Sequence, residues 1–586
     1  MFKHKTMFIF SFIPAALLLF SCVGTKPDVD PQPQPGPDVD TTAVKITPEI
    51  LSVSLPVYPT ATFSIDDVLS TVDIVLPYGS ILGRTAVEYT LSEKTTADPV
   101  SGTVQDLSKS FRVFLTAEDG TARKYTFNTA VGKSNKTGFK WVTVNDYLVE
   151  GKKSGKEISF KLPYGAKLEN LSFSVPSDNI LSFEPDITSG VDVREPLKVK
   201  FIAEDGVTFD EYTFNVTTYP KEEYSVRGIY LPSPTHTQSF MSYKSLCESL
   251  DLLQKLNFNC LFVGCWDKTK VAWDSEVLMA NTNYQSASAG NMYRNYTGGS
   301  GDAVADMISE AHKRGIKVVL WFEYGFMHRV GTVDFKDPLL AKHPGWIGFN
   351  SEGGYCNYNG TDYYLNAYDP AVQQFMIDLI CEAVNRYSEL DGVQGDDRLP
   401  ASPRNSGYNE FTKMQYMAET GKEAPSNYED SDWVAWRLSV LNGFAVKMYN
   451  AVKAIRKDCL VCFAPNKYPW AEGTLMQCWP QWVKDGAVDL LTVQCYVTAN
   501  YERDVDSQIE LMKKYSDRMV FQPAMILKNG SAILPSQLIS DELCHNRELG
   551  TLGESQFWFD GLYEEAPRKM FELFYNYPVA FPDLCR

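Results

Sequence analysis

From about residue 224 onward, short apolar runs alternate with longer segments whose apolar residues recur at helical spacing. Runs of four to eight apolar residues are typical of buried strands, and a 3.6-residue period is typical of helices. The predicted strands are Val226–Leu231, Cys260–Trp266, Lys317–Glu323, Leu390–Arg398, Leu460–Pro465, Leu490–Tyr496, Met519–Ile526 and about Gln556–Asp560. The clearest helical patterns are Tyr243–Leu256, Val304–Lys313, Pro370–Tyr387, Trp433–Arg456 and a last one from Pro567.

Eight strand–helix pairs over residues 224–586 predict an α/β fold, the (β/α)8 TIM barrel with insertions. A doubly wound open sheet is the alternative. Such sheets bind phosphates through glycine-rich loops, and no such loop follows any predicted strand. A long segment rich in Gly, Asn and Tyr, from Tyr324 to Asn366, is expected to form one wall of the cleft.

Residues 43–220 carry a different pattern, in which apolar and polar residues alternate in short strands. Leu76-Pro77-Tyr78-Gly79 recurs as Leu162-Pro163-Tyr164-Gly165, and Ala117-Glu118-Asp119-Gly120 recurs as Ala203-Glu204-Asp205-Gly206. The offset is 86 in both cases, so the segment is a tandem repeat. We predict two all-β, immunoglobulin-like sandwiches, residues 43–131 and 132–220, with the Glu-Asp-Gly segments as hairpin turns. Either they space the barrel from a surface or they bind glycan.

The first 42 residues predict a targeting segment and a linker rather than a folded domain. Lys3 and Lys5 precede an apolar stretch that is too short to span a bilayer, so residues 1–22 are expected to be a signal peptide. The stretch ends in Leu19-Phe20-Ser21-Cys22, which resembles a bacterial lipoprotein box with Cys22 as the lipidated residue. Residues 23–42 are proline-rich and acidic, which predicts an extended linker. The expected location is the cell envelope, anchored to the outer membrane on its periplasmic or outward face.

Charge and composition exclude several partners and cofactors. The net charge of −18, with no basic run after the first few residues, argues against binding nucleic acid. The six histidines show no ligand spacing and the cysteines form no zinc pattern, so neither a metal nor another cofactor is expected. Aromatic residues make up 13% of the chain, which suits stacking on sugar rings but also suits large β-rich cores.

The fourth predicted strand ends in two adjacent carboxylates and a guanidinium, Asp396-Asp397-Arg398. Asp is a poor strand former and neighbouring like charges repel, so these residues indicate a site. In a barrel, catalytic groups lie at the C-terminal ends of the strands. Side chains alternate along a strand, which points Gln394 and Asp396 toward the barrel axis and leaves Asp397 at the edge.

The same parity argument aligns Glu323 with Trp321 on the third strand, and Asp560 with Gln556 and Trp558 on the eighth. Glu323, Asp396 and Asp560 are therefore expected to converge at the mouth of the barrel. Carboxylates crowded into one cleft cannot all ionise, so one of them retains a proton. The alternative is a purely structural role, in which Asp397 and Arg398 form an ion pair and Glu323 caps a loop amide.

Several motifs resemble the glycosyl hydrolase-like 10 family of bacterial barrel proteins over roughly residues 224–580. The most specific are Asp391-Gly392-Val393-Gln394-Gly395-Asp396-Asp397 and Gln494-Cys495-Tyr496. The resemblance implies a glycosidase acting on a polysaccharide, because some relatives cleave the glycan strands of peptidoglycan. Two positions depart from the family: Trp266 stands where an arginine is expected, and Glu323 where an amide is more common.

Glycoside hydrolysis needs a protonated carboxyl to aid the leaving oxygen and a carboxylate to attack the sugar or activate water. We assign Asp396 as nucleophile or base, and Glu323 or Asp560 as the acid, with Asp397 beside them. The predicted substrate-binding residues, all at or near strand ends, are Arg398, Gln494, Tyr496, Asn466, Trp266, Trp321 and His236.

Three functions remain open from the residues alone. The first is a cell-envelope glycoside hydrolase acting on a polysaccharide or on peptidoglycan glycan strands. The second is a surface lipoprotein that binds glycan on an inactive barrel. The third is a carbohydrate esterase or deacetylase, although the chain has neither a Gly-x-Ser-x-Gly elbow nor a metal triad.

Overall fold

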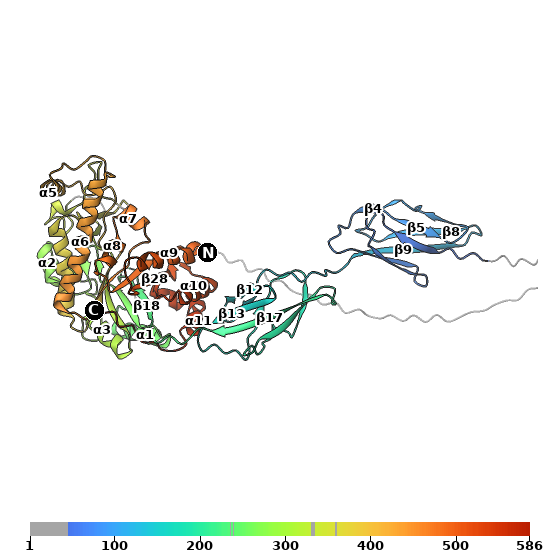
Figure 1. Ribbon diagram of the computed structural model, residues 1–586, viewed down its shortest axis with the longest axis horizontal. Coiled ribbons are helices and arrows are strands. Elements are labelled where there is room, and N and C mark those ends of the chain that lie inside the picture. Colours follow the sequence, from blue (N-terminus) through green and yellow to red (C-terminus); the bar gives the residue numbers. More distant parts are fainter. Residues whose placement is uncertain (1–44, 235, 238, 330–334, 358–359, 586) are drawn as a thin grey trace, which may run out of the picture. The chain divides into compact units, whose positions relative to one another are not determined.

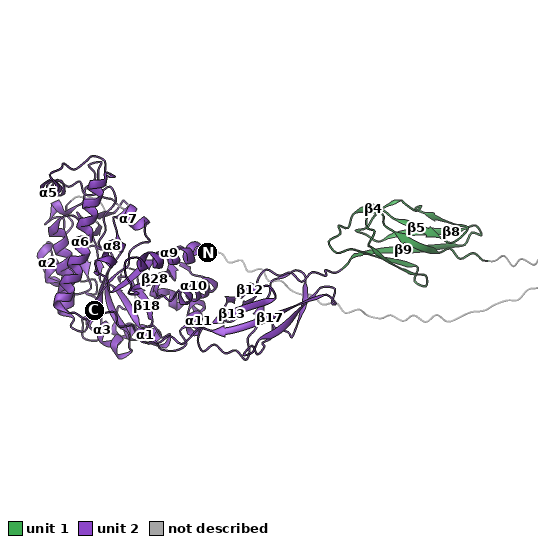
Figure 2. Ribbon diagram, in the orientation of Figure 1, with its two compact units in different colours: residues 1–132 green, residues 133–586 purple. Residues whose placement is uncertain are grey.

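The computed structural model describes residues 45–585, apart from residues 235, 238, 330–334 and 358–359. The chain divides into two compact units, residues 1–132 and 133–586, which are coloured separately in Figure 2. No helix of the described part has the length and apolar character that crossing a membrane requires. The predicted signal peptide, the lipidation site Cys22 and the linker at 23–42 lie outside the described residues.

The first β module is built on a mixed five-stranded sheet with the strand order β2-β3-β9-β8-β6. β3 pairs with β9 in parallel, and the other neighbours in this sheet are antiparallel. Two two-stranded sheets, β1–β5 and β4–β7, complete the module. The strands are β1 (Ile50–Ser54), β2 (Thr62–Asp66), β3 (Thr71–Leu76), β4 (Arg84–Ala86), β5 (Glu88–Leu91), β6 (Thr95–Asp98), β7 (Val104–Asp106), β8 (Phe111–Ala117) and β9 (Ala122–Val131).

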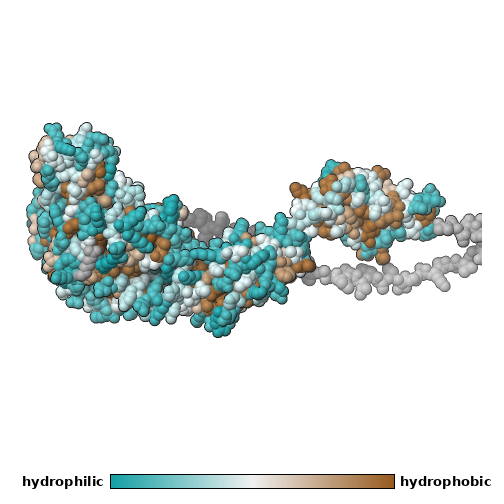
Figure 3. All heavy atoms as spheres, in the orientation of Figure 1, coloured by the Kyte–Doolittle hydropathy of each residue, from teal (hydrophilic) through white to brown (hydrophobic). Residues whose placement is uncertain are grey.

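Alternating residues of these strands form one core, to which β1 contributes Val53 and β3 contributes Val72. The module also exposes apolar side chains, among them Val68 and Ile81, and Figure 3 shows hydrophobic residues gathered on its visible face. The predicted hairpin turn at Ala117–Gly120 is present, with Gly120 at a φ of +83° that favours glycine.

The second β module repeats this plan, with the sheet order β12-β13-β17-β16-β15 and a parallel pairing of β13 with β17. A three-stranded sheet, β11-β10-β14, packs with it. The shared order is what the tandem repeat predicts, and the all-β character of residues 45–220 is confirmed. The strands are β10 (Thr143–Val144), β11 (Val149–Glu150), β12 (Lys152–Ser154), β13 (Glu157–Leu162), β14 (Phe173–Ser174), β15 (Ile180–Glu184), β16 (Leu197–Ala203) and β17 (Phe209–Thr218).

The rest of the chain forms a closed barrel of eight parallel strands, as predicted, in the order β18-β19-β22-β25-β26-β27-β28-β31. Helices lie around it (Figure 1). The strands are β18 (Val226–Leu231), β19 (Cys260–Gly264), β22 (Lys317–Phe322), β25 (Gly392–Gly395), β26 (Leu460–Phe463), β27 (Leu490–Gln494), β28 (Phe521–Ile526) and β31 (Gly553–Phe557). The main helices are α1 (Tyr243–Lys255), α3 (Ala303–Lys313), α4 (Pro370–Arg386), α6 (Ser431–Ile455), α8 (Trp479–Lys484), α9 (Tyr501–Lys513), α10 (Ser536–Leu549) and α11 (Glu565–Phe574).

Strand parity inside the barrel follows the prediction. Tyr230, Phe262 and Trp321 belong to a cluster within the barrel, whereas Val393 packs in the larger cluster that includes the surrounding helices. Shorter elements occupy the connections that follow the strands. They are β20 (Trp266–Asp267), β21 (Lys270–Val271), α2 (Glu276–Asn281), β23 (Met327–Arg329), β24 (Asp362–Tyr364), α5 (Glu410–Thr420), α7 (Trp470–Leu475), β29 (Lys528–Asn529), β30 (Ala532–Ile533) and the 3₁₀ turn η4 (Phe559–Tyr563).

Several strands end before the predicted residue, and two of these differences change the placement of predicted site residues. β25 stops at Gly395, so the Asp-Asp-Arg segment lies just beyond the strand rather than in it. β31 begins at Gly553 and stops at Phe557, about three residues earlier than expected, and Asp560 lies in η4. The start is set by Gly553, which has a φ of +113° and whose added Cβ would lie 2.1 Å from the Val226 carbonyl oxygen. Only glycine allows that approach.

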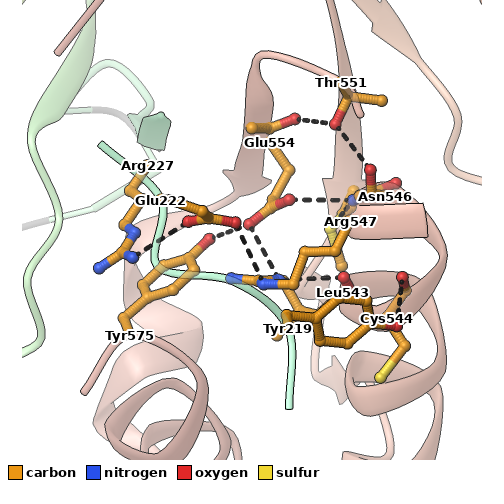
Figure 4. Close-up of polar contacts among 12 residues, drawn as sticks. Tyr219, Glu222, Arg227, Leu543, Cys544, Asn546, Arg547, Thr551, Glu554 and Tyr575 are labelled. Atoms are coloured by element: carbon orange, nitrogen blue, oxygen red, sulfur yellow. Dashed lines mark hydrogen bonds and ion pairs between the residues drawn. The ribbon is translucent and has the colours of Figure 1, made fainter. Parts of the chain in front are cut away.

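The second β module joins the barrel through a buried polar network near the start of β18 and β31 (Figure 4). The Glu554 carboxylate accepts a hydrogen bond from the Tyr575 hydroxyl (2.6 Å) and one from the Asn546 amide (3.1 Å), and it lies 4.0 Å from Arg547. Glu222, in the segment that leads into β18, pairs with both Arg227 and Arg547 at 3.3 Å. Both oxygens of Glu554 are therefore partnered.

Candidate active site

The candidate site lies where β22 and β25, neighbouring strands of the barrel, reach their C-terminal ends. Their register pairs Trp321 with Gln394 and Phe322 with Gly395. The next residue on each strand is a carboxylic acid, Glu323 on one and Asp396 on the other. Adjacent strands lie about 4.8 Å apart, so the two acids start from neighbouring points of the barrel rim.

Asp396 is held from both sides and is only 1% exposed. One carboxylate oxygen accepts a hydrogen bond from the Gln494 amide (3.0 Å), and the other accepts one from Arg398 (3.0 Å). Burial raises the pKa of Asp396 well above its usual range, and the charge of Asp397 raises it further. The surroundings of Asp396 therefore favour its protonated form.

Arg398 ties together the three acidic residues of the rim. Its Nη1 donates to Asp397 Oδ1 (2.6 Å), to Asp396 Oδ2 (3.0 Å) and to the backbone carbonyl of Glu323 (3.3 Å). The other oxygen of Asp397 accepts from the Asn466 amide at 3.1 Å. The predicted ion pair of Asp397 with Arg398 is therefore present, but it is part of a larger arrangement that also orients Asp396.

Glycines make this arrangement possible at the strand ends. A Cβ on Gly395 would lie 2.4 Å from the Leu399 carbonyl oxygen, and one on Gly325 would lie 2.3 Å from the Arg398 carbonyl oxygen. The backbone of the loop after β25 folds back through a hydrogen bond from Leu399 N to the Asp396 carbonyl at 3.0 Å. The loops that follow β22 and β25 can thus approach each other closely.

Glu323 is the most chemically unusual group at the rim. Its side chain is buried, and its Oε2 has no hydrogen-bond partner among the described residues. Burial raises its pKa from 4.5 to about 7, against the lowering effect of Arg398, with a further upward contribution from Asp267. At neutral pH this carboxyl is therefore protonated in a substantial fraction of molecules, which suits a general acid.

Residues after the second strand, which the sequence did not single out, complete this side of the rim. Lys268 is buried, with its Nζ 3.4 Å from the centroid of the Tyr324 ring and 3.4 Å from Asp267 Oδ1. Asp267 Oδ2 accepts from the Ser233 hydroxyl at 3.4 Å, and His236 Nδ1 lies 3.4 Å from that same hydroxyl. The charged pair Asp267-Lys268, directly after the predicted second strand, is the sequence feature that could have indicated these residues.

The floor below the carboxylates is polar. The Tyr230 hydroxyl, the Trp321 indole nitrogen and both amide atoms of Gln394 are buried without a hydrogen-bond partner in the described part of the chain. Tyr230 and Trp321 pack edge to face, with ring centroids 4.9 Å apart. Leaving such groups unpaired costs about 1–3 kcal/mol each. A polar ligand group or water reaching this depth would offset that cost.

Asp560 does not join the other acids, which corrects the prediction. Its Oδ1 accepts hydrogen bonds from Thr237 (2.8 Å) and Ser239 (3.2 Å), and it lines a hollow together with Glu248 and Leu252 of α1. Because β31 ends at Phe557, strand parity no longer applies at residue 560. The carboxyl faces an outer helix instead of the barrel mouth.

Two tryptophans predicted to bind substrate, Trp266 and Trp321, are buried. The Trp266 indole is fully buried, packs against Phe375 and donates to the Gly325 carbonyl at 2.8 Å. Trp321 lies in the barrel interior, 3% exposed. Neither presents a face on which a sugar could stack. Of the other predicted binding residues, His236 is exposed near the rim, and the Tyr496 ring packs 5.3 Å from the Phe557 ring.

Comparison with known families decides the identity of the barrel. Residues 225–529 match the profile of the family described as "Glycosyl hydrolase-like 10", which is more than half of the chain. The chain belongs to the glycosyl hydrolase-like 10 family. Residues 50–129, in the first β module, match the family described as "SGBP, N-terminal". Membership indicates a glycan-processing, hydrolase-like protein.

Individual relatives are distant. The chain is 26% identical over 235 residues to "Glycosyl hydrolase DigH" of Escherichia coli K12, covering 39% of this chain and 49% of that protein. It is 27% identical over 159 residues to "Glycosyl hydrolase YngK" of Bacillus subtilis, covering 26% and 28%. The chain therefore spans about half the length of DigH and 28% of the length of YngK.

Among solved structures, the glycoside hydrolase domain of PgaB (BpsB) from Bordetella bronchiseptica aligns with a TM-score of 0.42 at 11% identity. The alignment covers 56% of this chain and 93% of that one. The catalytic domain of a β-amylase from Paenibacillus polymyxa also aligns with a TM-score of 0.42, at 10% identity, covering 60% of this chain and 99% of the other.

Proposed function

We propose that this member of the glycosyl hydrolase-like 10 family is a glycoside hydrolase that cleaves a polysaccharide or a peptidoglycan glycan strand. The observation that carries the proposal is the pair of carboxyls on adjacent strand ends, Glu323 and Asp396, both with raised pKa values. Glycoside hydrolysis needs such a pair, one proton donor and one carboxylate facing an oxocarbenium-like centre.

In the proposed reaction Glu323 is the general acid. Its proton passes to the glycosidic oxygen as the bond to the anomeric carbon breaks, while an Asp396 oxygen attacks that carbon. Positive charge developing on the sugar favours the ionised form of Asp396, and Arg398 and Gln494 hold its two oxygens in place. A water then attacks the anomeric carbon, gives a proton to Glu323 and releases Asp396.

The reaction can proceed with retention or with inversion of configuration, and the separation of the two carboxyls decides which. Retaining glycosidases hold their two carboxyls about 5–5.5 Å apart, and inverting enzymes about 6.5–9.5 Å apart. The anomeric form of the product therefore reports which of these separations the two carboxyls take during the reaction.

The test is release of new reducing ends from peptidoglycan glycan strands and from a panel of polysaccharides. Wild-type protein should release them, and Asp396→Asn should reduce the rate at least 100-fold, which is the lower range for removing one catalytic group. A wild type that is inactive on every substrate, or an Asp396→Asn variant with unchanged rates, would overturn the proposal. Analysis of the product anomer by NMR distinguishes retention from inversion.

Glycan binding without hydrolysis is the second candidate, and two observations favour it. Asp396 is 1% exposed with both oxygens engaged, which restricts its access to a substrate carbon. The first β module also matches the "SGBP, N-terminal" family, which suggests a glycan partner. Glycan retention by wild-type protein without any release of reducing ends would select this function.

For location we propose a lipid-anchored envelope protein. Support comes from the apolar stretch that ends at Cys22 and from the proline-rich residues that follow. In this proposal the β modules are immunoglobulin-like spacers that hold the barrel away from the outer membrane. Metabolic labelling with a radioactive fatty acid should mark the wild-type protein and not Cys22→Ser, and labelling of both would overturn the assignment.

A further inference from the structure

A groove lies between the second β module and the outside of the barrel. Its cavity volume is about 760 Å³. One wall comes from the module and includes Phe139, Trp141 and Glu150, and the other comes from α9 and α10 and includes Glu502 and Asp541. Ligand sites in proteins commonly measure about 300–1,000 Å³, so the groove has the size of a site for a small oligosaccharide.

The groove has firm walls because the module is docked on α10 by hydrogen bonds. The Ser540 hydroxyl donates to the Tyr147 carbonyl (2.7 Å), and the Gln537 amide donates to the Leu148 carbonyl (2.6 Å). The Tyr219 hydroxyl donates to the Cys544 carbonyl at 3.2 Å. Buried residues of the module and of the barrel also belong to one hydrophobic cluster. The module is therefore not a loose tether, and its inner face is held at the barrel surface.

The side chains of the groove suit an uncharged, hydroxyl-rich ligand. Trp141 is 41% exposed, although an indole of that size is normally covered, and it offers an apolar face. Four lysines and four carboxylates line the groove, so their charges balance. Nucleic acid and anionic lipid need an excess of positive charge, which is not available here. Carboxylates and ammonium groups around an aromatic face can instead exchange hydrogen bonds with sugar hydroxyls.

Three of the carboxylates come from different elements and lie close enough to affect one another. Asp541 of α10 faces Glu150 of β11 and Glu502 of α9, and their charges add to burial in raising the pKa of Asp541. Asp541 accepts a hydrogen bond from Gln537 (2.9 Å), whereas Lys152 and Glu548 form an ion pair at 2.8 Å on the rim. The groove thus presents carboxylate oxygens from both of its walls, one of which also contributes Trp141.

A relationship within the chain points to the same ligand class. The module that forms one wall is the second copy of the tandem repeat, and the first copy is the part that matches the "SGBP, N-terminal" family. The two copies share their sheet order. The second copy lies in one compact unit with the barrel.

We propose that this groove is a second glycan-binding site, which takes a neutral oligosaccharide segment against Trp141 and between the carboxylates of Glu150 and Asp541. It lies on the outer helices and is separate from the carboxylates at the barrel mouth. The site would hold a polysaccharide on the protein independently of cleavage. The proposal goes beyond the hydrolase function and does not depend on it.

The experiment uses the full chain carrying Asp396→Asn, to prevent cleavage, in affinity gel electrophoresis. The probes are xyloglucan, galactomannan, pullulan and mixed-linkage β-glucan, with polygalacturonate as the anionic comparison. Trp141→Ala should weaken retention by at least one of the neutral polysaccharides about tenfold, since an aromatic contact contributes up to about 1.5 kcal/mol. Phe209→Ala, which removes an exposed ring elsewhere on the same module, should change nothing.

A second measurement, amide hydrogen exchange, does not depend on any variant. Adding the retained polysaccharide should protect residues 139–153 and 537–549, the two walls of the groove. Retention that is unchanged in Trp141→Ala, retention only by polygalacturonate, or the absence of retention by all neutral probes would overturn the proposal. If the barrel proves inactive while Trp141→Ala loses binding, only the proposed hydrolysis fails.

Discussion

The barrel contains two buried carboxylate clusters, one at each end, and they are built in opposite ways. At the N-terminal end, both oxygens of Glu554 are partnered by Tyr575 and Asn546, with Arg547 beside them. At the C-terminal end, Glu323 keeps one oxygen without a hydrogen-bond partner among the described residues. Both side chains are almost fully buried. What separates a structural carboxylate from a reactive one here is therefore partnership rather than burial.

A second contrast limits that conclusion. Glu542, on α10, is also buried, has no partner for either oxygen in the described part of the chain, and has a pKa raised to about 9 by burial. It lies on an outer helix and not at the end of a barrel strand. An unpartnered carboxyl indicates a reactive site only where the fold also brings other functional groups, as Arg398 and Asp396 are brought to Glu323.

The largest expected effect is on catalysis at the C-terminal cluster. Glu323→Gln removes the proposed proton donor and should lower the rate of glycan hydrolysis about 10²–10⁴-fold. Glu554→Gln, the matched change at the other end, should leave the rate of correctly folded protein within about threefold. Reducing-end release by both purified variants measures this. Equal losses in the two variants would remove the distinction between the clusters.

The next effect is on stability, and it is expected at the N-terminal cluster rather than at the C-terminal one. Glu554→Gln weakens the buried hydrogen bonds from Tyr575 and Asn546 and removes one of the two carboxylates beside Arg547, which keeps Glu222 at 3.3 Å. The change should cost about 1.5–3 kcal/mol of unfolding free energy, the range for hydrogen bonds to charged groups. Thermal unfolding of the full chain, followed through the transition of the larger unit, measures the loss. Lys244→Ala, which breaks an exposed pair with Glu248, serves as the control and should change stability by less than about 1 kcal/mol.

The pH dependence gives Glu323 a separate signature. Its pKa rises from 4.5 to about 7 on folding, so the folded state binds its proton more tightly and stability falls as pH increases through that interval. The full penalty above pH 7 is on the order of 3 kcal/mol. Glu323→Gln should therefore be more stable than wild type at pH 8 and equal to it near pH 4.5. Wild-type hydrolysis should decline above about pH 7 as the acid ionises.

The smallest expected effect on hydrolysis tests whether a buried carboxyl must lie at the end of a barrel strand to take part in catalysis. Glu542→Gln should leave hydrolysis within about twofold, because residue 542 lies away from the strand ends. It should raise stability at pH 7 on the order of 3 kcal/mol, since the folded state no longer keeps an acid protonated above its ordinary pKa. Melting temperatures at pH 5 and pH 8 separate this change from a general packing effect. A large loss of activity would extend the functional site to α10.

Much of the fold and half of the site could be predicted from local patterns. The eight strands follow from the length and spacing of apolar runs, and the placement of Asp396, Asp397 and Glu323 at strand ends follows from Asp and Glu being misfits in a buried strand. Asp560 was misplaced because β31 ends at Phe557, and strand parity has no meaning past the last paired residue. Trp266 was misplaced because nothing in the order of residues reveals which face of a loop aromatic is covered.

The amino-acid order by itself determined the sequence of β repeats and barrel, the period of the strands and the residues that carry charge at their ends. Those properties depend on neighbours along the chain, through side-chain alternation and the cost of burying charge. Only the tertiary structure decided that Arg398 binds three acidic residues at once, that one oxygen of Glu323 has no hydrogen-bond partner among the described residues, and that the second module forms a groove with α10. These depend on atoms brought together from distant segments, and no local spacing encodes them.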